Sequence, residues 1–358
     1  MVRRRRSPSA ALLRAFFPPP RPVRKKATRS KTAVAGRRPV RQRAVSERGA
    51  IGKPYLGSGT WLAATYSGPQ GTRPYFLYVP IGLDSATAVP LLVALHGCDQ
   101  DAAEFAATTR LNLLADRHKF VVAYPQQRRV DNAQGCWNWF RPNHQERGLG
   151  EPAILAGIVG RIIGQPAGWT IDASRVYVVG LSAGGAMAAI LAATYPELFA
   201  AVGVHSAPPY RAASTVLNAS RAMAGLSGPP SAPRPASAPM PPLVIFHGTR
   251  DHVVSSVNAE RLAVQWLAHN AVQPGHPGST QIGDNRAYVG SASRSAGGRR
   301  AFEVQRWYGP RGRKMLEMWT VEGLGHAWSG GTPHGSYSDP RGPRASTEMW
   351  RFLAGHHT

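Results

Sequence analysis

The segment from residue 176 to residue 192 most constrains what this chain can fold into. Its first residues are β-branched or aromatic and lead to Gly180, Ser182 follows two positions later, and after Gly184 the chain becomes Ala-rich. The pattern predicts a strand, a sharp turn and a helix, with a serine hydroxyl at the apex of the turn. The G-x-S-x-G spacing has a steric reason, because only small neighbours let strand and helix close around a serine in strained backbone geometry. Since an ordinary tight turn shows the same small residues, the interpretation depends on partners for Ser182.

Apolar runs alternate with helical patterns along most of the chain. We expect strands at 73–80, 91–95, 120–125, 176–181, 201–206, 243–248, 301–308 and 314–321, and helices at 102–118, 151–165, 254–269 and 345–354. Continuous apolar runs are typical of strands buried on both faces, so the fold class is α/β, with a mostly parallel central sheet and helices on both faces. The proline that ends the first of these strands favours a place at the sheet edge.

Three regions depart from this pattern. Residues 1–50 form a basic tail that we expect to be disordered, and we expect residues 51–358 to form the folded α/β domain. Residues 1–48 hold 16 Lys and Arg against one acid, which is +15 of the chain's formal charge of +24 and leaves +9 for the rest. Residues 207–242 are rich in Ala, Ser and Pro, and we expect a cap or insertion over the sheet. Residues 273–300 are polar and predict an irregular surface loop.

Partners for Ser182 follow later in the chain. Asp251 comes after the apolar run 243–246, and His326 lies in a Gly-lined loop after the run that ends at Val321. The order Ser, Asp, His, with each residue after a strand, is that of an α/β-hydrolase catalytic triad. Three other histidines compete for the role of base, but a triad base comes from a later loop than the acid, which selects His326. The three competitors are His205, His247 and His252.

The oxyanion hole of such an enzyme needs two backbone donors. One is expected to be the N–H group of Ala183, directly after the nucleophile, and the other the N–H group of Cys98, after the strand 91–95. Cys98 and Cys136 flank a predicted strand, so a disulfide between them is geometrically feasible, but two unpaired small apolar side chains are equally consistent with the sequence. We expect three tryptophans to line a substrate pocket, with plain core packing as the alternative: Trp137, Trp139 and Trp328.

Several longer motifs carry a family resemblance. They are Leu95–Cys98, Cys136–Phe140, Gly148–Pro152, Gly180–Gly185, His247–Asp251 and Gly325–Gly331. Together they resemble the polyhydroxybutyrate depolymerase family of esterases, which are α/β-hydrolases akin to feruloyl and acetylxylan esterases of carbohydrate esterase family one. The resemblance covers about residues 55–355. It implies a Ser182–Asp251–His326 triad, ester hydrolysis without a cofactor or metal, and a cysteine pair that matches Cys98 and Cys136.

The function expected from these features is that of a serine esterase acting on poly(3-hydroxybutyrate), another hydroxyalkanoate polyester or its oligomers. A feruloyl or acetylxylan esterase with the same machinery is the alternative enzyme. An alternative of another class is a binding protein that uses residues 1–48 to hold nucleic acid or the anionic surface of a storage granule. Secreted members of the resembled family often add a polymer-binding domain, and nothing in the sequence matches one.

The compartment follows less directly from the sequence. No apolar run reaches the length of a membrane span, and the basic segment makes a poor export signal because Arg14 interrupts its apolar patch. We therefore expect a cytoplasmic protein, which could associate with granules. The alternative is an extracellular location, like that of secreted members of the resembled family. A bridged cysteine pair would favour the second.

Overall fold

A computed structural model describes residues 57–165, 167–228, 239–271, 289–293, 298–309 and 312–358 of the protein. The basic segment expected at residues 1–50 lies outside the described residues, so its disorder and its binding partners stay predictions. Among the helices of the described part, none combines the length and the apolar character that crossing a membrane requires.

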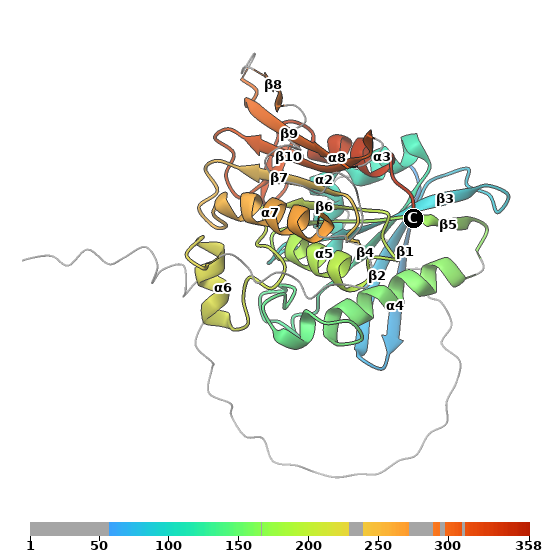
Figure 1. The fold of residues 1–358 in the computed structure, drawn as a ribbon. Coiled ribbons are helices and arrows are strands. Elements are labelled where there is room, and N and C mark those ends of the chain that lie inside the picture. The colour runs from blue at the N-terminus through green and yellow to red at the C-terminus, as the bar shows by residue number, and fades with distance from the viewer. Residues whose placement is uncertain (1–56, 166, 229–238, 272–288, 294–297, 310–311) are drawn as a thin grey trace, which may run out of the picture. The chain divides into compact units, whose positions relative to one another are not determined.

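A ten-stranded sheet organises the described chain (Figure 1). Its strands follow the spatial order β1-β2-β4-β3-β5-β6-β7-β10-β9-β8. The six central strands, β4-β3-β5-β6-β7-β10 in spatial order, are parallel to one another. Antiparallel strands flank this group on both sides. The expected mostly parallel central sheet is therefore confirmed. The strands are β1 (Thr60–Gly68), β2 (Gly71–Val79), β3 (Ala88–Leu95), β4 (Val121–Pro125), β5 (Thr170–Leu181), β6 (Ala201–His205), β7 (Leu243–Gly248), β8 (Val289–Ser293), β9 (Phe302–Tyr308) and β10 (Lys314–Val321).

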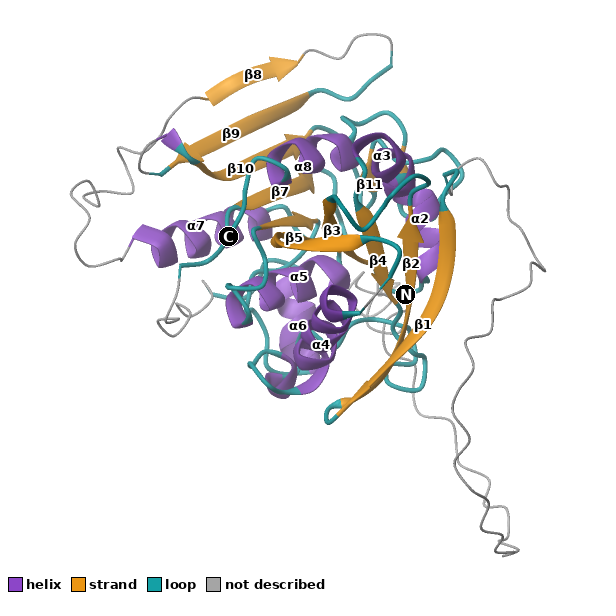
Figure 2. Cartoon of the chain, turned by 90° about the vertical axis from the view of Figure 1, so that its right-hand side faces the viewer, coloured by secondary structure: helices purple, strands orange, loops and turns teal. Residues whose placement is uncertain are grey.

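Helices cover both faces of this sheet, as Figure 2 shows from a second direction. One buried cluster joins α4, α5, α6 and α7 to one face, and a second joins α2, α3 and α8 to the other. Successive residues of β3 alternate between the two clusters, because side chains of a strand point to opposite faces in turn. The helices are α2 (Ala102–Thr109), α3 (Leu111–His118), α4 (Gly150–Gly164), α5 (Ala183–Thr194), α6 (Val216–Met223), α7 (Val257–Ala271) and α8 (Ala345–Leu353), with a short 3-10 turn η2 (Pro142–His144).

Three sequence expectations about elements were wrong. The helix expected at 102–118 is split, because Arg110 has a φ of 58° and ends α2 before α3 begins. The strand expected at the sheet edge, β2, lies between β1 and β4. The edge is formed by β1, a strand that was not expected and that pairs antiparallel with β2. The polar stretch 273–300 contains a strand, β8, that pairs with β9.

The Ala-, Ser- and Pro-rich segment 207–242 packs against the helices in its described part. Tyr210 is buried and donates from its hydroxyl to the carbonyl of Gln145, 2.9 Å away. The side chain of Gln265, on α7, donates in turn to the carbonyl of Tyr210 over 2.9 Å. The inner side of α6 is buried through Ala219 and Ala222. Residues 229–238 of this segment lie outside the described residues.

Candidate active site

The turn between β5 and α5 holds Ser182 in an unusual backbone conformation. Ser182 has a φ of 56° and a ψ of −120°, which a residue with a side chain rarely adopts, and α5 begins at the next residue. A Cβ atom added to Gly184 would lie 2.2 Å from the carbonyl oxygen of Leu95, and one added to Gly180 would lie 2.3 Å from the backbone of Gly184. Only glycine lets β5, α5 and β3 approach so closely. The strand, turn and helix expected from the sequence are therefore present.

Neighbouring strands place the loops of the other two expected triad residues near this turn. Leu181 pairs with His205 on β6, His205 with Phe246 on β7, and Phe246 with Trp319 on β10. The loops after β7 and β10 are joined directly, since the backbone N–H of Arg250 donates to the carbonyl of Leu324 over 3.0 Å. Ser182, Asp251 and His326 thus all follow the carboxyl ends of strands in one half of the sheet, where parallel sheets gather their functional groups.

Asp251 and His326 form a buried hydrogen bond. The Nδ1 atom of His326 lies 2.8 Å from Oδ2 of Asp251, whose side chain is 0% exposed, and the His326 side chain is 8% exposed. Because a carboxylate only accepts hydrogen bonds, Nδ1 carries the proton. The other oxygen, Oδ1, accepts from the backbone N–H groups of Val253 and Val254 at 3.0 and 2.8 Å. Burial raises the pKa of Asp251, but its hydrogen bond with His326 and the nearby imidazoles outweigh burial, so the pKa lies below the usual value.

The competing histidines have other surroundings. His205 is fully buried, stacks on Trp328 with ring centroids 5.1 Å apart, and accepts from the backbone N–H of Ser329 at 3.1 Å. Burial lowers the pKa of His205 to about 3. His247 is also buried, with its Nε2 atom 2.9 Å from the carbonyl of Val254 and 3.6 Å from Asp251. His252 is exposed. His326 therefore lies closer to the Asp251 carboxylate than His247 does, although His247 is much nearer to Asp251 in sequence. The contact of Ser182 with His326 stays a prediction.

The expected oxyanion donors lie where α5 begins and where β3 ends. Ala183 is the first residue of α5, and Gly97 and Cys98 directly follow the close approach between Gly184 and the end of β3. The backbone N–H of Gly97 is already occupied, because it donates to Oε1 of Gln100 at 3.0 Å. The two backbone donors of Ala183 and Cys98 remain our prediction for the oxyanion hole.

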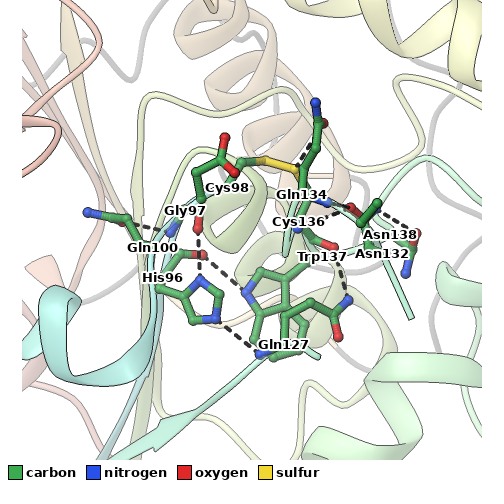
Figure 3. Close-up of a disulfide and its surroundings, with 12 residues drawn as sticks. His96, Gly97, Cys98, Gln100, Gln127, Asn132, Gln134, Cys136, Trp137 and Asn138 are labelled. Carbon is green, nitrogen blue, oxygen red and sulfur yellow. Dashed lines mark hydrogen bonds between the residues drawn. A yellow bond between two sulfur atoms is a disulfide. The ribbon is translucent and has the colours of Figure 1, made fainter. Parts of the chain in front are cut away.

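A disulfide joins Cys98 to Cys136 and ties this loop to the segment after β4 (Figure 3). Around it, the carbonyl of His96 accepts from the indole N–H of Trp137 at 3.1 Å, and Nε2 of His96 accepts from the backbone N–H of Gln127 at 3.1 Å. The pairing that the sequence left open is thus settled.

The three expected pocket tryptophans lie in or close to the core. Trp137 and Trp328 are 0% exposed, and Trp139 is 5% exposed. The indole N–H of Trp328 is also occupied, since it donates to the hydroxyl of Ser346 at 3.0 Å. Complete burial leaves Trp137 and Trp328 no surface that faces a substrate in this conformation. Their burial agrees with the alternative of plain core packing, and a role in a substrate pocket stays a prediction for the three tryptophans.

Sequence reasoning missed a second buried acid, Glu151, behind the disulfide. It lies in the first turn of α4 and accepts from the backbone N–H and the side-chain amide of Asn138 at 2.7 and 2.8 Å, and from the side chain of Gln127. Arg73 lies 3.8 Å from the same carboxylate, and Nδ1 of His144 lies 3.3 Å away. Burial raises the pKa of Glu151, but His144, the Arg73 charge and Asn138 together bring it below the usual value. The motif Gly148–Pro152 was the available signal.

Comparison with known proteins identifies the fold and the family of the chain. The fold is that of the α/β-hydrolases: acetyl xylan esterase from Aspergillus awamori superposes with a TM-score of 0.63 at 22% identity, over 83% of this chain and all of that one. Residues 73–290 match the model of the family described as esterase PHB depolymerase, and the chain belongs to that family. Among its relatives, poly(3-hydroxyalkanoate) depolymerase C of Paucimonas lemoignei is 32% identical over 291 residues, which is 78% of this chain and 64% of the relative.

A further relative is the probable acetylxylan esterase A of Aspergillus fumigatus, which is 32% identical over 230 residues, or 60% of either chain. The chain therefore spans somewhat less than two thirds of the length of these two relatives.

Proposed function

We propose that the protein is a serine esterase that hydrolyses carboxylic esters through an acyl-enzyme, with poly(3-hydroxybutyrate), another hydroxyalkanoate polyester or its oligomers as substrate. The observation that carries the proposal is the buried contact of Asp251 with His326 on loops next to the strained Ser182 turn. Family membership and the depolymerase relative support the choice of polyester.

The first half-reaction forms the acyl-enzyme. The Ser182 hydroxyl attacks the ester carbonyl while His326 takes its proton, and Asp251 stabilises the imidazolium. The carbonyl oxygen becomes an oxyanion, held by the N–H groups of Ala183 and Cys98. As the tetrahedral intermediate collapses, the bond to the alcohol oxygen breaks and His326 donates its proton to that oxygen. Water then attacks the acyl-enzyme by the same route, which releases the acid and restores the serine.

Replacing the nucleophile tests this mechanism. Ser182→Ala is expected to lower kcat/KM for p-nitrophenyl butyrate by at least about 1,000-fold, because no other hydroxyl can take its place in the acyl transfer. Thermal unfolding is expected to change little, since alanine fits the space of serine. Residual activity within tenfold of the unchanged protein would disprove the triad.

An acetylxylan or feruloyl esterase activity is the second candidate. Acetylxylan esterase A of Aspergillus fumigatus is as similar in sequence over its shorter alignment as the depolymerase is. Initial rates on hydroxybutyrate oligomers, acetylated xylan and feruloyl esters decide between them. The polyester proposal requires the largest kcat/KM on the oligomers.

The location and the partners of the chain are part of the proposal. The disulfide favours an oxidising compartment, and so the extracellular alternative over the cytoplasm, because cytosolic thiols are kept reduced. Residues 1–48, with their excess of Lys and Arg, suit an anionic surface such as a storage granule or nucleic acid. Binding through them requires a steep fall in affinity as salt rises, and its loss on deletion of the segment.

A further inference from the structure

An exposed tyrosine outside the triad faces the expected catalytic base. The rings of Tyr337 and His326 meet edge to face with centroids 6.0 Å apart, and Tyr337 is 42% exposed. Among the described residues, no other tyrosine is exposed to this extent. No sequence motif marks Tyr337, because it lies in a stretch of small and polar residues, 11 positions after His326.

Tyr337 has an unfavourable backbone conformation that its hydrogen-bonded surroundings maintain. Its φ is 49°, in the left-handed region that residues with a side chain rarely occupy. The carbonyl of Tyr337 accepts from the backbone N–H of Trp328 at 2.6 Å, where the short strands β11 (Trp328–Ser329) and β12 (Ser338–Asp339) pair. Such strain persists only where the surroundings impose it, and it often marks a functional site.

Gln100 connects the loop of Tyr337 to the loop of the expected oxyanion donor. Its Oε1 atom accepts from the backbone N–H of Gly97 at 3.0 Å, and its Nε2 atom donates to the carbonyl and the hydroxyl of Ser336, both at 3.2 Å. One side chain thus joins the residue before Cys98 to the residue before Tyr337. The tyrosine is therefore placed relative to both the base and the oxyanion donor.

Charges around Tyr337 keep its hydroxyl protonated. Burial of part of the side chain raises the pKa of Tyr337, and the negative charges of Asp99 and Glu104 raise it further. At neutral pH the side chain therefore offers an apolar ring together with a hydrogen-bond donor. This combination suits an uncharged group with an apolar body and a carbonyl acceptor.

We propose that Tyr337 is a specificity residue that contacts the alcohol portion of the ester, on the leaving-group side of the scissile bond. The proposal rests on the proposed esterase function, in which His326 donates its proton to the departing alcohol oxygen. The substrate group nearest His326 is therefore the alcohol portion, and the exposed ring beside His326 borders it. In a hydroxyalkanoate oligomer this portion is the next monomer, which carries both an alkyl group and an ester carbonyl.

The test uses two series of esters and the variant Tyr337→Asn. Asparagine tolerates a positive φ, so the loop keeps its conformation while the ring is removed. The first series keeps the butyryl group and varies the alcohol among ethanol, p-nitrophenol and methyl 3-hydroxybutyrate. The second series keeps p-nitrophenol and varies the acyl group among acetyl, butyryl and hexanoyl.

We expect Tyr337→Asn to lower kcat/KM about tenfold for the two larger alcohols relative to ethanol, mainly through KM. The order of preference in the acyl series is expected to stay the same. The butyryl-enzyme is identical for all three alcohols, so its rate of hydrolysis, measured after a burst, is also expected to stay the same. A fall in that rate would overturn the proposal in favour of an effect through His326, which acts in both half-reactions.

Two matched variants complete the experiment. Tyr337→Phe keeps the ring but not the donor, so it is expected to retain the preference for p-nitrophenol over ethanol and to lose part of the preference for methyl 3-hydroxybutyrate. Val264→Ala, at a position on α7 that is 58% exposed, is expected to change neither series. An unchanged alcohol preference in Tyr337→Asn, with active wild-type protein, overturns the proposal for Tyr337 alone. Failure of the wild-type protein to hydrolyse any of these esters overturns the proposed function as well.

Discussion

The structure contains two buried carboxylates beside histidines, and they differ in what surrounds them. Asp251 accepts from two backbone N–H groups on one oxygen and contacts His326 with the other. Glu151 accepts from two side-chain amides on Oε1, which also faces Arg73. Its Oε2 atom accepts from a backbone N–H and lies 3.3 Å from His144. Both have a lowered pKa and are therefore ionised at neutral pH. A buried acid beside a histidine is thus not by itself a sign of catalysis.

The difference lies in how many groups depend on each carboxylate. Glu151 links β2, through Arg73, to the segment after β4 and to α4, so it holds together the packing behind the disulfide. Asp251 fixes a loop through local backbone bonds, and its other oxygen is left to orient one imidazole. We therefore expect substitution of Asp251 to affect the rate of reaction and substitution of Glu151 to affect stability.

Of the two acids, Asp251 has the larger expected effect, that of Asp251→Asn on turnover. An amide in place of the carboxylate no longer holds the proton on Nδ1 of His326 or stabilises the imidazolium, and in a serine triad this costs about 10,000-fold in kcat. The Oδ1 contacts with the loop can be kept by the amide oxygen. Activity on p-nitrophenyl butyrate and urea unfolding of the same sample measure the two effects, and an undiminished kcat would show that Asp251 is not the triad acid.

Glu151→Gln should show the opposite pattern. The amide has one acceptor oxygen where the carboxylate has two, so at least one buried donor loses its partner and the charge of Arg73 loses one counter-charge. Breaking a buried ionic contact costs about 3 kcal/mol of the free energy of unfolding. Urea unfolding measures this loss, and kcat at low temperature should stay within a few-fold of the unchanged protein. If Glu151→Gln keeps full stability but loses turnover, the distinction between the two acids is wrong.

A further effect, expected of two buried histidines, is a loss of stability in mild acid. Burial lowers the pKa of His205 to about 3 and that of His96 to about 4, from an ordinary value of 6.5. Between the folded-state pKa and 6.5 the unfolded chain binds protons that the folded chain does not. The free energy of unfolding is therefore highest above about pH 6.5 and falls as the pH drops. Each such histidine contributes about 1.4 kcal/mol per pH unit. Urea midpoints at pH 7, 6 and 5 measure the slope, and a flat profile would show that these imidazoles protonate in the folded protein.

The sequence predicted best what local chemistry determines. The continuous apolar runs predicted the central strands, and the chain order Ser182, Asp251, His326 predicted the pairing of acid and base, because both depend on residues next in sequence to a strand end. The edge strand β1 was missed because it is mostly exposed and its apolar run covers only residues 61–64. The helix expected at 102–118 breaks at Arg110, where no glycine or proline announces a turn.

The surroundings of the site were less predictable, because they depend on contacts between residues far apart in sequence. Gln100 and Ser336 are 236 residues apart, and Arg73 and Asp131 are 58 residues apart. The buried positions of Trp137 and Trp328 follow from how loops pack on the sheet, which composition does not show. Tyr337 escaped notice for the same reason.

The order of strands has a consequence for biosynthesis. In the proposed triad, Ser182 directly follows β5 and Asp251 follows β7, but His326 follows β10, 75 residues beyond Asp251. A chain emerging from the ribosome therefore presents Ser182 long before it has any partner to activate it. If the proposed triad is correct, we expect fragments that end before β10 to contain Ser182 and to be inactive, because they lack His326.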